Sequence, residues 1–535
     1  MLSACARSND GAAIASCEPI ADSPASRPLT IPALLQWEPA SGTFSLGDGA
    51  RIVASSAFAP VAQTFAEDLQ ALTGRALPVL TDGAQSGDIV LAPESCDATL
   101  GVEGYRLAIG DRLQIRALTP NGAFYGTRTA LQLLHQSPQI ARGRARDVPR
   151  YPERGMMVDA GRKYFSPAWL ALHVRELAYL KMNYLHLHFS DNEGFRIESE
   201  SHPEIVSADR LSKDEVRSIV ALAQRYFITV TPEIDMPGHM AAALGPHPEL
   251  QLENVLGHKD ASRLDVTNPA ALPFATELIE EYLALFPGPY WHTGADEYLP
   301  PTGYDLHPQL ASYAQAQYGS DAVAKDAVHG FTNRVDELVR AHGRTTRMWH
   351  DDLNGGAAVT VNPDIVVEWW TNVSPLSDPF PPDPQSILDA GHEIENSGWF
   401  PTYYVQGGAF GVSPLPPPAD MRSAYESWEV NQFYGPLYYD QSLNFPPDVI
   451  DPVEPRNRGA KLNLWSDDPT AETEDKVTAH IAPNLRVIAQ KDWGSPLLVP
   501  DYASFETIMA AVGGPALDQQ RSLMRPAGGR LQSSL

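Results

Sequence analysis

Between residues 154 and 466, short apolar runs alternate with stretches in which apolar residues recur every three or four positions. The first pattern is typical of buried strands and the second of amphipathic helices. Strands that alternate with helices predict parallel βα units, and eight such units predict a (β/α)8 TIM barrel, here over residues 149–495. The eight strand candidates are residues 155–159, 184–190, 228–234, 290–296, 346–350, 365–370, 393–397 and 461–466.

Helix start signals follow the first three strand candidates. Ser166 before Pro167 gives an N-cap and a proline at the first helical position, and Asn268 before Pro269 repeats this signal. Ser212 with Glu215 three residues later forms a capping box. These signals predict helices that begin near residues 167, 213 and 269.

Residues 30–148 show a different pattern, which predicts a small α+β domain before the barrel. Helical spacing covers residues 61–72 and 122–134. Residues 105–109 and 113–117 alternate between apolar and polar positions around Gly110-Asp111, which indicates a hairpin. We find no convergent catalytic set in this block. A helical stretch at 502–512 lies in the C-terminal tail, residues 496–535.

Residues 1–29 are small, polar and contain proline, and we expect a flexible leader there. The start, Leu2-Ser3-Ala4-Cys5, resembles a bacterial lipoprotein cleavage box, but the charged and apolar regions that precede such a box are missing. We therefore expect a secreted, periplasmic or lipoprotein-anchored bacterial protein whose signal is absent or trimmed.

The charge balance restricts the partners of the protein. The net charge of −27 disfavours nucleic acid and anionic membranes as partners and fits a neutral or cationic substrate. We see no apolar run of about 18 residues, so we expect no membrane span. The three cysteines lack the spacing of metal ligands, and we expect neither a metal nor a cofactor.

Polar and aromatic residues gather where the predicted barrel strands end. In a TIM barrel, chemistry is carried at the C-terminal ends of the strands. Carboxylates, an arginine and aromatic rings together suit a neutral sugar, because rings stack on the apolar faces of pyranoses and Arg or Asp bind hydroxyls. The residues at these ends are Asp159, Arg162, Asp191, Asp235, His239, Asp296, Glu297, Trp349, Trp370, Tyr403, Tyr404, Trp465 and Asp467.

Asp296 and Glu297 form the most informative pair in this set. Adjacent acids raise each other's pKa, which suits a general acid, although a solvated acidic loop has the same sequence. Glycoside hydrolysis usually needs two carboxyl groups on either side of the bond. Consecutive residues on a strand point to opposite sides, so this pair does not suit the roles of nucleophile and acid. We therefore expect the nucleophile to come from the substrate.

Several motifs resemble those of family 20 glycoside hydrolases, the β-N-acetylhexosaminidase family. The segment His292-Thr293-Gly294-Ala295-Asp296-Glu297 resembles the family signature His-x-Gly-x-Asp-Glu. The likeness covers roughly residues 30–495. Further matches lie at residues 154–162, 183–191, 232–239 and 464–467, and in the preceding domain at 103–105 and 122–126.

The resemblance implies substrate-assisted hydrolysis of β-linked N-acetylhexosamine through an oxazolinium intermediate. It implies that Glu297 is the general acid and base, that Asp296 orients the acetamido N–H, and that Tyr403 or Tyr404 holds the acetamido oxygen. The other implied contacts are Arg162 and Asp467 to hydroxyls, Trp349, Trp370 and Trp465 as pocket walls, and Asp191 with His239 as polar support.

Asp467 departs from the family pattern, which usually has a longer Glu at this position. This feature and Asn192-Glu193 resemble the lacto-N-biosidase branch, which releases a disaccharide. Two other classes of function remain open. A metal-dependent barrel hydrolase would use His186 and His188 as ligands, and a sugar-binding module would bind GlcNAc without turnover. Asp159 is a candidate both for a substrate contact and for a structural partner of Arg154 or Arg162.

Overall fold

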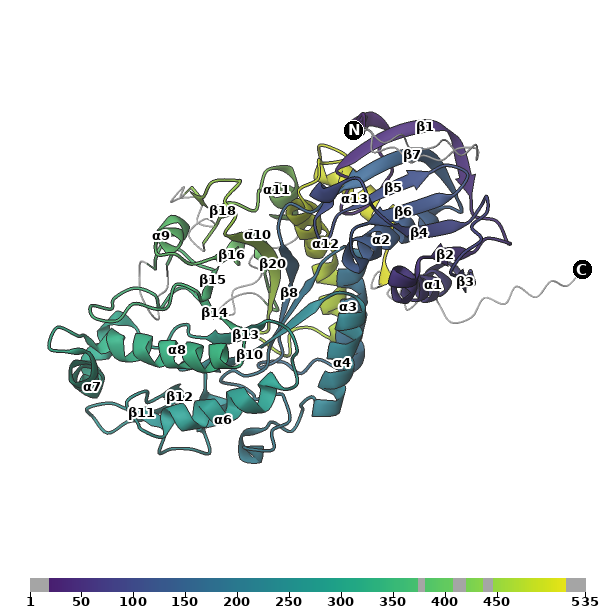
Figure 1. Ribbon diagram of the computed structural model, residues 1–535. Coiled ribbons are helices and arrows are strands. Elements are labelled where there is room, and N and C mark those ends of the chain that lie inside the picture. The colour runs from purple at the N-terminus through teal and green to yellow at the C-terminus, as the bar shows by residue number, and fades with distance from the viewer. Residues whose placement is uncertain (1–18, 374–380, 408–419, 436–445, 516–535) are drawn as a thin grey trace, which may run out of the picture. The chain divides into compact units, whose positions relative to one another are not determined.

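The structure of the protein, a computed structural model, describes residues 19–373, 381–407, 420–435 and 446–515 (Figure 1). Two compact units divide the chain: one holds residues up to 149 with 494–499 and 505–513, and the other holds residues 150–493 with 500–504. The Leu2–Cys5 box, most of the predicted leader and residues 516–535 of the predicted tail lie outside the described residues.

Within the described residues of the larger unit, eight parallel strands form a closed barrel. Their order is β16-β15-β14-β13-β10-β9-β8-β20, and β16 pairs with β20 to close the ring. The predicted TIM barrel is therefore confirmed. The strands are β8 (Glu153–Asp159), β9 (Tyr184–His188), β10 (Thr229–Met236), β13 (Tyr290–Gly294), β14 (Thr345–Trp349), β15 (Val366–Trp369), β16 (Ile394–Asn396) and β20 (Asn457–Trp465).

Two of the three predicted helix starts are correct. The Ser166 side chain accepts from Trp169 N–H at the start of α3 (Pro167–Tyr179), and Ser212 with Glu215 forms the capping box of α4 (Lys213–Arg225). The third predicted helix is present, but its cap is not Asn268, because α6 begins two residues later than predicted, at Ala271 (Ala271–Leu283). The Asn268 side chain instead accepts from Ala270 N–H in a turn before the helix.

Longer connections of the barrel carry additional elements. The remaining helices are α5 (Ala241–Leu244), α7 (Pro308–Tyr318), α8 (Ala324–Ala341), α9 (Pro384–Asp389), α10 (Trp399–Thr402), α11 (Asp420–Glu426) and α12 (Glu474–Trp493). The short helices η4 (Pro203–Ile205) and η5 (Pro301–Leu306) precede α4 and α7. The pairs β11 (Gln251–Glu253) with β12 (Lys259–Leu264) and β18 (Gln432–Phe433) with β19 (Asp448–Val449) form small sheets, and β17 (Tyr403–Val405) pairs with β20.

Charged side chains fill part of the barrel interior. Arg347 on β14 lies 2.8 Å from Glu153 Oε2 and 2.7 Å from Glu368 Oε1, and it also pairs with Glu395. Lys461 on β20 pairs with Glu368 and lies 3.5 Å from Glu395 Oε2. All five side chains are buried. Buried charges are tolerated when they are paired, so these strands form an ionic layer inside the barrel.

The smaller unit contains, among the described residues, a seven-stranded sheet of order β1-β7-β5-β6-β4-β2-β3. The predicted hairpin is confirmed by β5 (Tyr105–Ile109) and β6 (Leu113–Ala117), and the predicted helices by α1 (Ala59–Thr73) and α2 (Pro120–Gln136). The helix expected at 502–512 is present as α13 (Tyr502–Val512). The remaining elements are β1 (Gln36–Ser45), β2 (Ile52–Ala54), β3 (Val79–Leu80), β4 (Ile89–Pro93), β7 (Gln139–Asp147), η1 (Pro24–Ser26), η2 (Ser56–Phe58) and η3 (Ala98–Leu100).

Among the described residues, no helix is both long enough and apolar enough to cross a bilayer.

Candidate active site

The predicted site residues follow the C-terminal ends of the barrel strands. Arg162 follows β8, Asp191 follows β9 and His239 follows β10. Asp296 and Glu297 follow β13, and Trp349 ends β14. Trp370 follows β15, Tyr403 and Tyr404 begin β17, Trp465 ends β20, and Asp467 lies two residues farther on.

The turn after β13 sets the direction of the acid pair. Gly294, Ala295 and Glu297 have φ values of +71°, +66° and +48°, so three residues of this turn are left-handed. A Cβ added at Gly294 would lie 1.7 Å from Asp235 Oδ1, so the close approach of Asp235 requires glycine there. Left-handed backbone at Ala295 and Glu297 is strained, and such strain concentrates at functional sites.

This geometry corrects one step of the sequence argument. The strand ends at Gly294, so Asp296 and Glu297 are not consecutive residues of a strand and do not point to opposite sides of a sheet. Both carboxylates face one imidazole: His239 Nε2 lies 3.6 Å from Asp296 Oδ2 and 3.3 Å from Glu297 Oε2. The two carboxylates therefore converge on one imidazole nitrogen.

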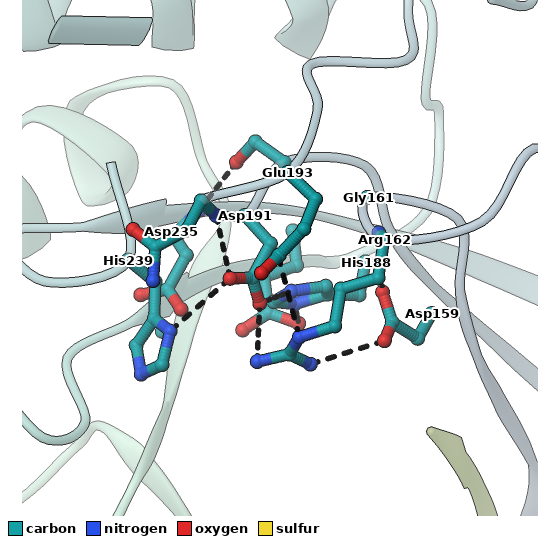
Figure 2. A network of polar contacts seen from close by, with 12 residues as sticks. Asp159, Gly161, Arg162, His188, Asp191, Glu193, Asp235 and His239 are labelled. Atoms are coloured by element: carbon teal, nitrogen blue, oxygen red, sulfur yellow. Dashed lines mark hydrogen bonds and ion pairs between the residues drawn. The ribbon is translucent and has the colours of Figure 1, made fainter. Parts of the chain in front are cut away.

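Asp191 connects the acid pair to Arg162. Its Oδ1 lies 3.2 Å from His239 Nδ1, and its Oδ2 lies 2.8 Å from Arg162 Nη2 (Figure 2). Burial alone would raise the pKa of Asp191, but Arg162 and His239 outweigh burial and hold the pKa well below its usual value. Asp191 is therefore a carboxylate at neutral pH that bridges two cationic groups.

The pKa values of His239 and Asp296 are both raised, for different reasons. Burial alone would lower the pKa of His239, but Asp191 and Asp296 raise it well above its usual value. Burial raises the pKa of Asp296, His239 opposes this shift, and Glu297 adds to it. A charged imidazolium thus faces both acids and keeps the cost of placing them together low.

Arg162 is held from several directions. Its Nη1 lies 3.0 Å from Asp159 Oδ2, and its Nε lies 3.6 Å from Glu193 Oε2 (Figure 2). Asp159 also accepts the backbone N–H groups of Arg162 and Ser466. Asp159 is fully buried, so the structure favours a structural partner of Arg162 over a substrate contact.

Aromatic side chains line the neighbouring strand ends. Tyr403 stacks on Trp370, with ring centroids 6.4 Å apart, and on Trp399 at 5.7 Å. Trp465 lies between Tyr403 and Trp349, with centroid distances of 6.0 and 5.7 Å. Four of the rings predicted from the sequence, Trp349, Trp370, Tyr403 and Trp465, therefore form one continuous cluster. Trp369 packs instead in an apolar cluster outside the barrel, with Met348, Val367, Ile387 and Phe433.

The two tyrosines that the sequence left unresolved differ in their surroundings. The Tyr404 hydroxyl lies 2.8 Å from both the Glu472 carboxylate and His480 Nδ1. Tyr403 belongs to the aromatic cluster, and burial together with nearby Asp296 raises the pKa of its hydroxyl well above its usual value. The structure therefore brings Tyr403 to the acid pair and directs Tyr404 elsewhere.

Asp351 and Asp352 were missed by the sequence analysis. Asp351 accepts Glu297 N–H at 3.0 Å and Trp370 Nε1–H at 2.9 Å, and Asp352 accepts Tyr298 N–H at 3.0 Å. Both side chains are buried, and Lys325 pairs with Asp352. These carboxyl groups hold the strained turn in place. Their position directly after the strand predicted at residues 346–350 was the sequence signal that could have identified them as site residues.

Asp235 adds another buried carboxyl group beside the pair. Burial and the neighbouring Asp296 raise the pKa of Asp235 well above its usual value. Asp467 is exposed as a residue, although partial burial raises the pKa of its carboxyl group against the effect of Arg162.

Some of these residues have the arrangement of metal ligands. One ligand atom from each member lies within 4.8 Å of the others in the groups His186-Glu233-His292, His188-Glu233-Asp235 and Asp235-His239-Asp296, and in a group outside the site, His202-Glu204-His247. His186 and His188 do not share a group, although both lie beside Glu233. Burial and Lys461 lower the pKa of His186 to about 3, whereas Glu233 and Asp191 overcome burial and raise that of His188.

Comparison with known proteins places this geometry in a family. The model of the glycosyl hydrolase family 20 catalytic domain matches residues 151–495, and that of domain 2 of the same family matches residues 27–148. A lacto-N-biosidase of Bifidobacterium bifidum is 32% identical over 87% of this chain and 40% of its own length. A beta-hexosaminidase of Porphyromonas gingivalis is 26% identical over 89% of this chain and 61% of its own length. The chain thus spans only part of the length of these relatives.

Solved structures agree with the family match. An exo beta-N-acetylglucosaminidase of Vibrio harveyi in complex with N-acetylglucosamine superposes with a TM-score of 0.73 at 22% identity, covering 95% of this chain and 79% of its own. A beta-N-acetylhexosaminidase of Streptomyces coelicolor has a TM-score of 0.69 at 25% identity and covers 92% and 96% of the two chains. The barrel, its preceding domain and the matched motifs together show that the chain belongs to glycosyl hydrolase family 20.

Proposed function

We propose that the protein is a retaining β-N-acetylhexosaminidase that uses the 2-acetamido group of its substrate as the nucleophile. The observation that carries this proposal is the placement of Asp296 and Glu297 on one turn, both facing His239 Nε2. Two carboxylates that leave one turn and converge on a single imidazole nitrogen are not arranged to flank an anomeric carbon as acid and nucleophile. The family resemblance supplies the missing nucleophile, the acetamido oxygen.

Glu297 is the general acid in this proposal and then the general base for water. Its backbone N–H is fixed by Asp351, and its carboxyl group lies beside the cationic His239. Glu297 protonates the glycosidic oxygen while the acetamido oxygen attacks the anomeric carbon, and the leaving group departs. Water then opens the oxazolinium ring and gives its proton to Glu297, which restores the acid and retains the configuration.

Asp296 and Tyr403 act on the acetamido group. Asp296 accepts its N–H and stabilises the positive charge that develops as the oxazolinium ring closes. Tyr403 donates its hydroxyl to the acetamido oxygen, and its raised pKa keeps that proton in place at neutral pH. Arg162 binds hydroxyls of the terminal sugar, while Trp349, Trp370 and Trp465 contact the apolar faces of the ring.

Release of a disaccharide is the second candidate, and Asp467 favours it. Asp467 replaces the longer Glu of the family pattern and is exposed. A carboxylate that is one methylene shorter leaves space where a longer side chain would contact the terminal sugar. The B. bifidum relative, which is named a lacto-N-biosidase, supports the same alternative.

Two nitrophenyl glycosides distinguish these candidates. We expect hydrolysis of p-nitrophenyl GlcNAc, and cleavage of p-nitrophenyl lacto-N-bioside alone would replace the first candidate by the second. Turnover of neither would contradict both. Glu297→Gln should lower kcat by about 10²–10⁴, the usual contribution of general acid–base catalysis. Glu277→Gln, an exposed glutamate on α6, is the matched control and should retain full activity.

A further inference from the structure

Glu233 occupies the centre of the polar network below the acid pair, although no role in the proposed mechanism requires it. The residue lies within β10, and its side chain is fully buried. The strand register places His188 of β9 on one side of it and His292 of β13 on the other. A carboxylate in this position is costly unless every lone pair is used.

Four nitrogen atoms from three other strands lie close to the Glu233 carboxylate, and those of His188 and Trp349 form hydrogen bonds with it. Its Oε2 lies 2.6 Å from His188 Nδ1 and 2.9 Å from His186 Nε2. Its Oε1 accepts Trp349 Nε1–H at 2.9 Å and lies 3.0 Å from His292 Nδ1. These contacts hold the pKa of Glu233 well below its usual value against the effect of burial, so the group is charged.

One branch from Glu233 leads to the acid pair. The His188 ring joins two carboxylates, because its Nδ1 lies 2.6 Å from Glu233 and its Nε2 lies 3.0 Å from Asp191 Oδ2. Asp191 in turn holds His239, which faces both Asp296 and Glu297. Figure 2 shows His188, Asp191 and His239 in this sequence.

The other branch leads to the aromatic wall. Trp349 ends β14 and is 1% exposed, and its indole N–H has Glu233 as acceptor. This hydrogen bond, together with packing against His292 and Trp465, restricts the orientation of the ring. The Glu233 carboxylate therefore positions two parts of the site. One is the Trp349 ring, which is proposed to contact the sugar, and the other is the series of contacts through His188, Asp191 and His239 to the proposed acid, Glu297.

We infer that Glu233 is a positioning residue for the reaction. Its side chain orients Trp349 directly, and it orients His239 through His188 and Asp191. This inference rests on the proposed function, because it assigns Glu233 to the machinery that serves Glu297. Glu233 touches neither acid itself. Its role is to keep His188 doubly protonated and Trp349 in a single orientation.

Glu233→Gln tests the inference, because the amide keeps the size of the side chain but replaces one acceptor oxygen by a donor. We expect kcat to fall by about 10–10²-fold, since a displacement of about 1 Å at a distance from the chemistry has this effect. Loss of the Glu233 charge also lowers the pKa of His188. His188 then loses its second proton at lower pH, so the alkaline limb of the pH–activity profile moves to lower pH.

The groups that face His188 define this titration. They are Glu233 and Asp235 from β10, Asp191 after β9, Asp159 from β8 and Asp296 after β13, and the His188 ring also contacts Trp465 of β20. Of these, only Glu233 is changed in the variant, so a shift of the alkaline limb reports the loss of its charge.

Glu395→Gln is the matched control. Glu395 is also a buried glutamate of the barrel, on β16, and it pairs with Arg347 and Lys461 instead of the His188 chain. The control should change thermal stability without moving the pH profile. An unchanged profile and kcat for Glu233→Gln, with only a lower Tm, would overturn the inference.

A double-mutant cycle with His239→Ala tests the route. If Glu233 acts through His239, Glu233→Gln should cost much less activity in the His239→Ala background than in the wild type, and full additivity would contradict this route. Should Glu233→Gln not fold, His188→Gln tests the same link with Glu233 in place, and full kcat for His188→Gln would overturn the inference.

Different results would overturn the role of Glu233 and the proposed function. A wild type that hydrolyses neither nitrophenyl glycoside contradicts the proposed function. Calorimetric binding of GlcNAc across the same pH range then tests Glu233, and identical binding by wild type and Glu233→Gln would overturn its role.

Discussion

We predict that the barrel becomes less stable as the pH rises because Glu395 ionises. Glu395→Gln should prevent this loss of stability. Glu395 lies in the ionic layer, where Arg347 and Lys461 face the carboxyl groups of Glu153, Glu368 and Glu395. Arg458 also pairs with Glu153 at 2.6 Å, whereas Lys461 pairs with Glu368 and lies farther, at 3.5 Å, from Glu395. Glu153 and Glu368 have lowered pKa values, whereas burial, with Glu368 nearby and Lys461 in opposition, raises the pKa of Glu395 to about 7.

The size of the effect follows from this shift. The ordinary pKa of 4.5 applies to the unfolded chain and about 7 to the folded one, so the folded state binds the proton more tightly. The resulting stability is fully present below pH 4.5 and is lost as the pH rises through 7. The loss amounts to about 3 kcal/mol, which for a barrel of this length is a change in Tm on the order of 5 °C.

The amide introduced by Glu395→Gln would mimic the protonated carboxyl group and would not titrate. We expect similar Tm values for wild type and variant near pH 5, and a higher Tm for the variant by on the order of 5 °C near pH 8.5, measured by thermal unfolding across that range. Glu337→Gln, an exposed position on α8, controls for the change in net charge. A Tm difference that stays constant with pH, or a variant that is less stable at pH 8.5, would refute the reasoning.

Three further predictions concern the acid pair and its surroundings. Gly294→Ala should lose about 10²-fold in kcat/KM, because the new methyl group displaces Asp235 and because alanine in a left-handed conformation costs roughly 1–2 kcal/mol. The control Gly319→Ala, at φ +102° with open space around it, should keep its activity. Tyr403→Phe should lower kcat by about 10², whereas Tyr404→Phe should remain near the wild type, and equal losses would contradict the assignment. GlcNAc-thiazoline, which mimics the oxazolinium intermediate, should inhibit at least about 10²-fold more tightly than GlcNAc, and comparable inhibition would argue against participation of the acetamido group.

The periodic pattern of the chain was sufficient to predict the barrel. Each predicted strand corresponds to an observed strand, because strands buried on both faces are read as apolar runs whatever surrounds them. The strands of the smaller unit were harder to predict from the sequence. Strands β1 and β7 were missed, since β1 contains Pro39 and Gly42 and β7 carries three arginines, so neither shows an apolar run.

The sequence was sufficient to locate the candidate site, but not to predict the directions in which its side chains point. The position of Asp296 and Glu297 followed from the motif, whereas their common direction depends on three left-handed residues that no pattern of polarity reveals. Glu233 and Asp351 were missed for a related reason. Their importance lies in contacts with other strands, and those contacts depend on the barrel register.

The turn at residues 294–297 has a consequence for transfer of this chemistry to other barrels. Its backbone is held by carboxyl groups from the two flanking strands: Asp235 packs against Gly294, and Asp351 binds the Glu297 N–H. The smallest portable unit is therefore a segment of three adjacent strands and not a hexapeptide. A barrel designed to accept the Asp-Glu pair would need a buried acid on each neighbouring strand end before the motif itself was introduced.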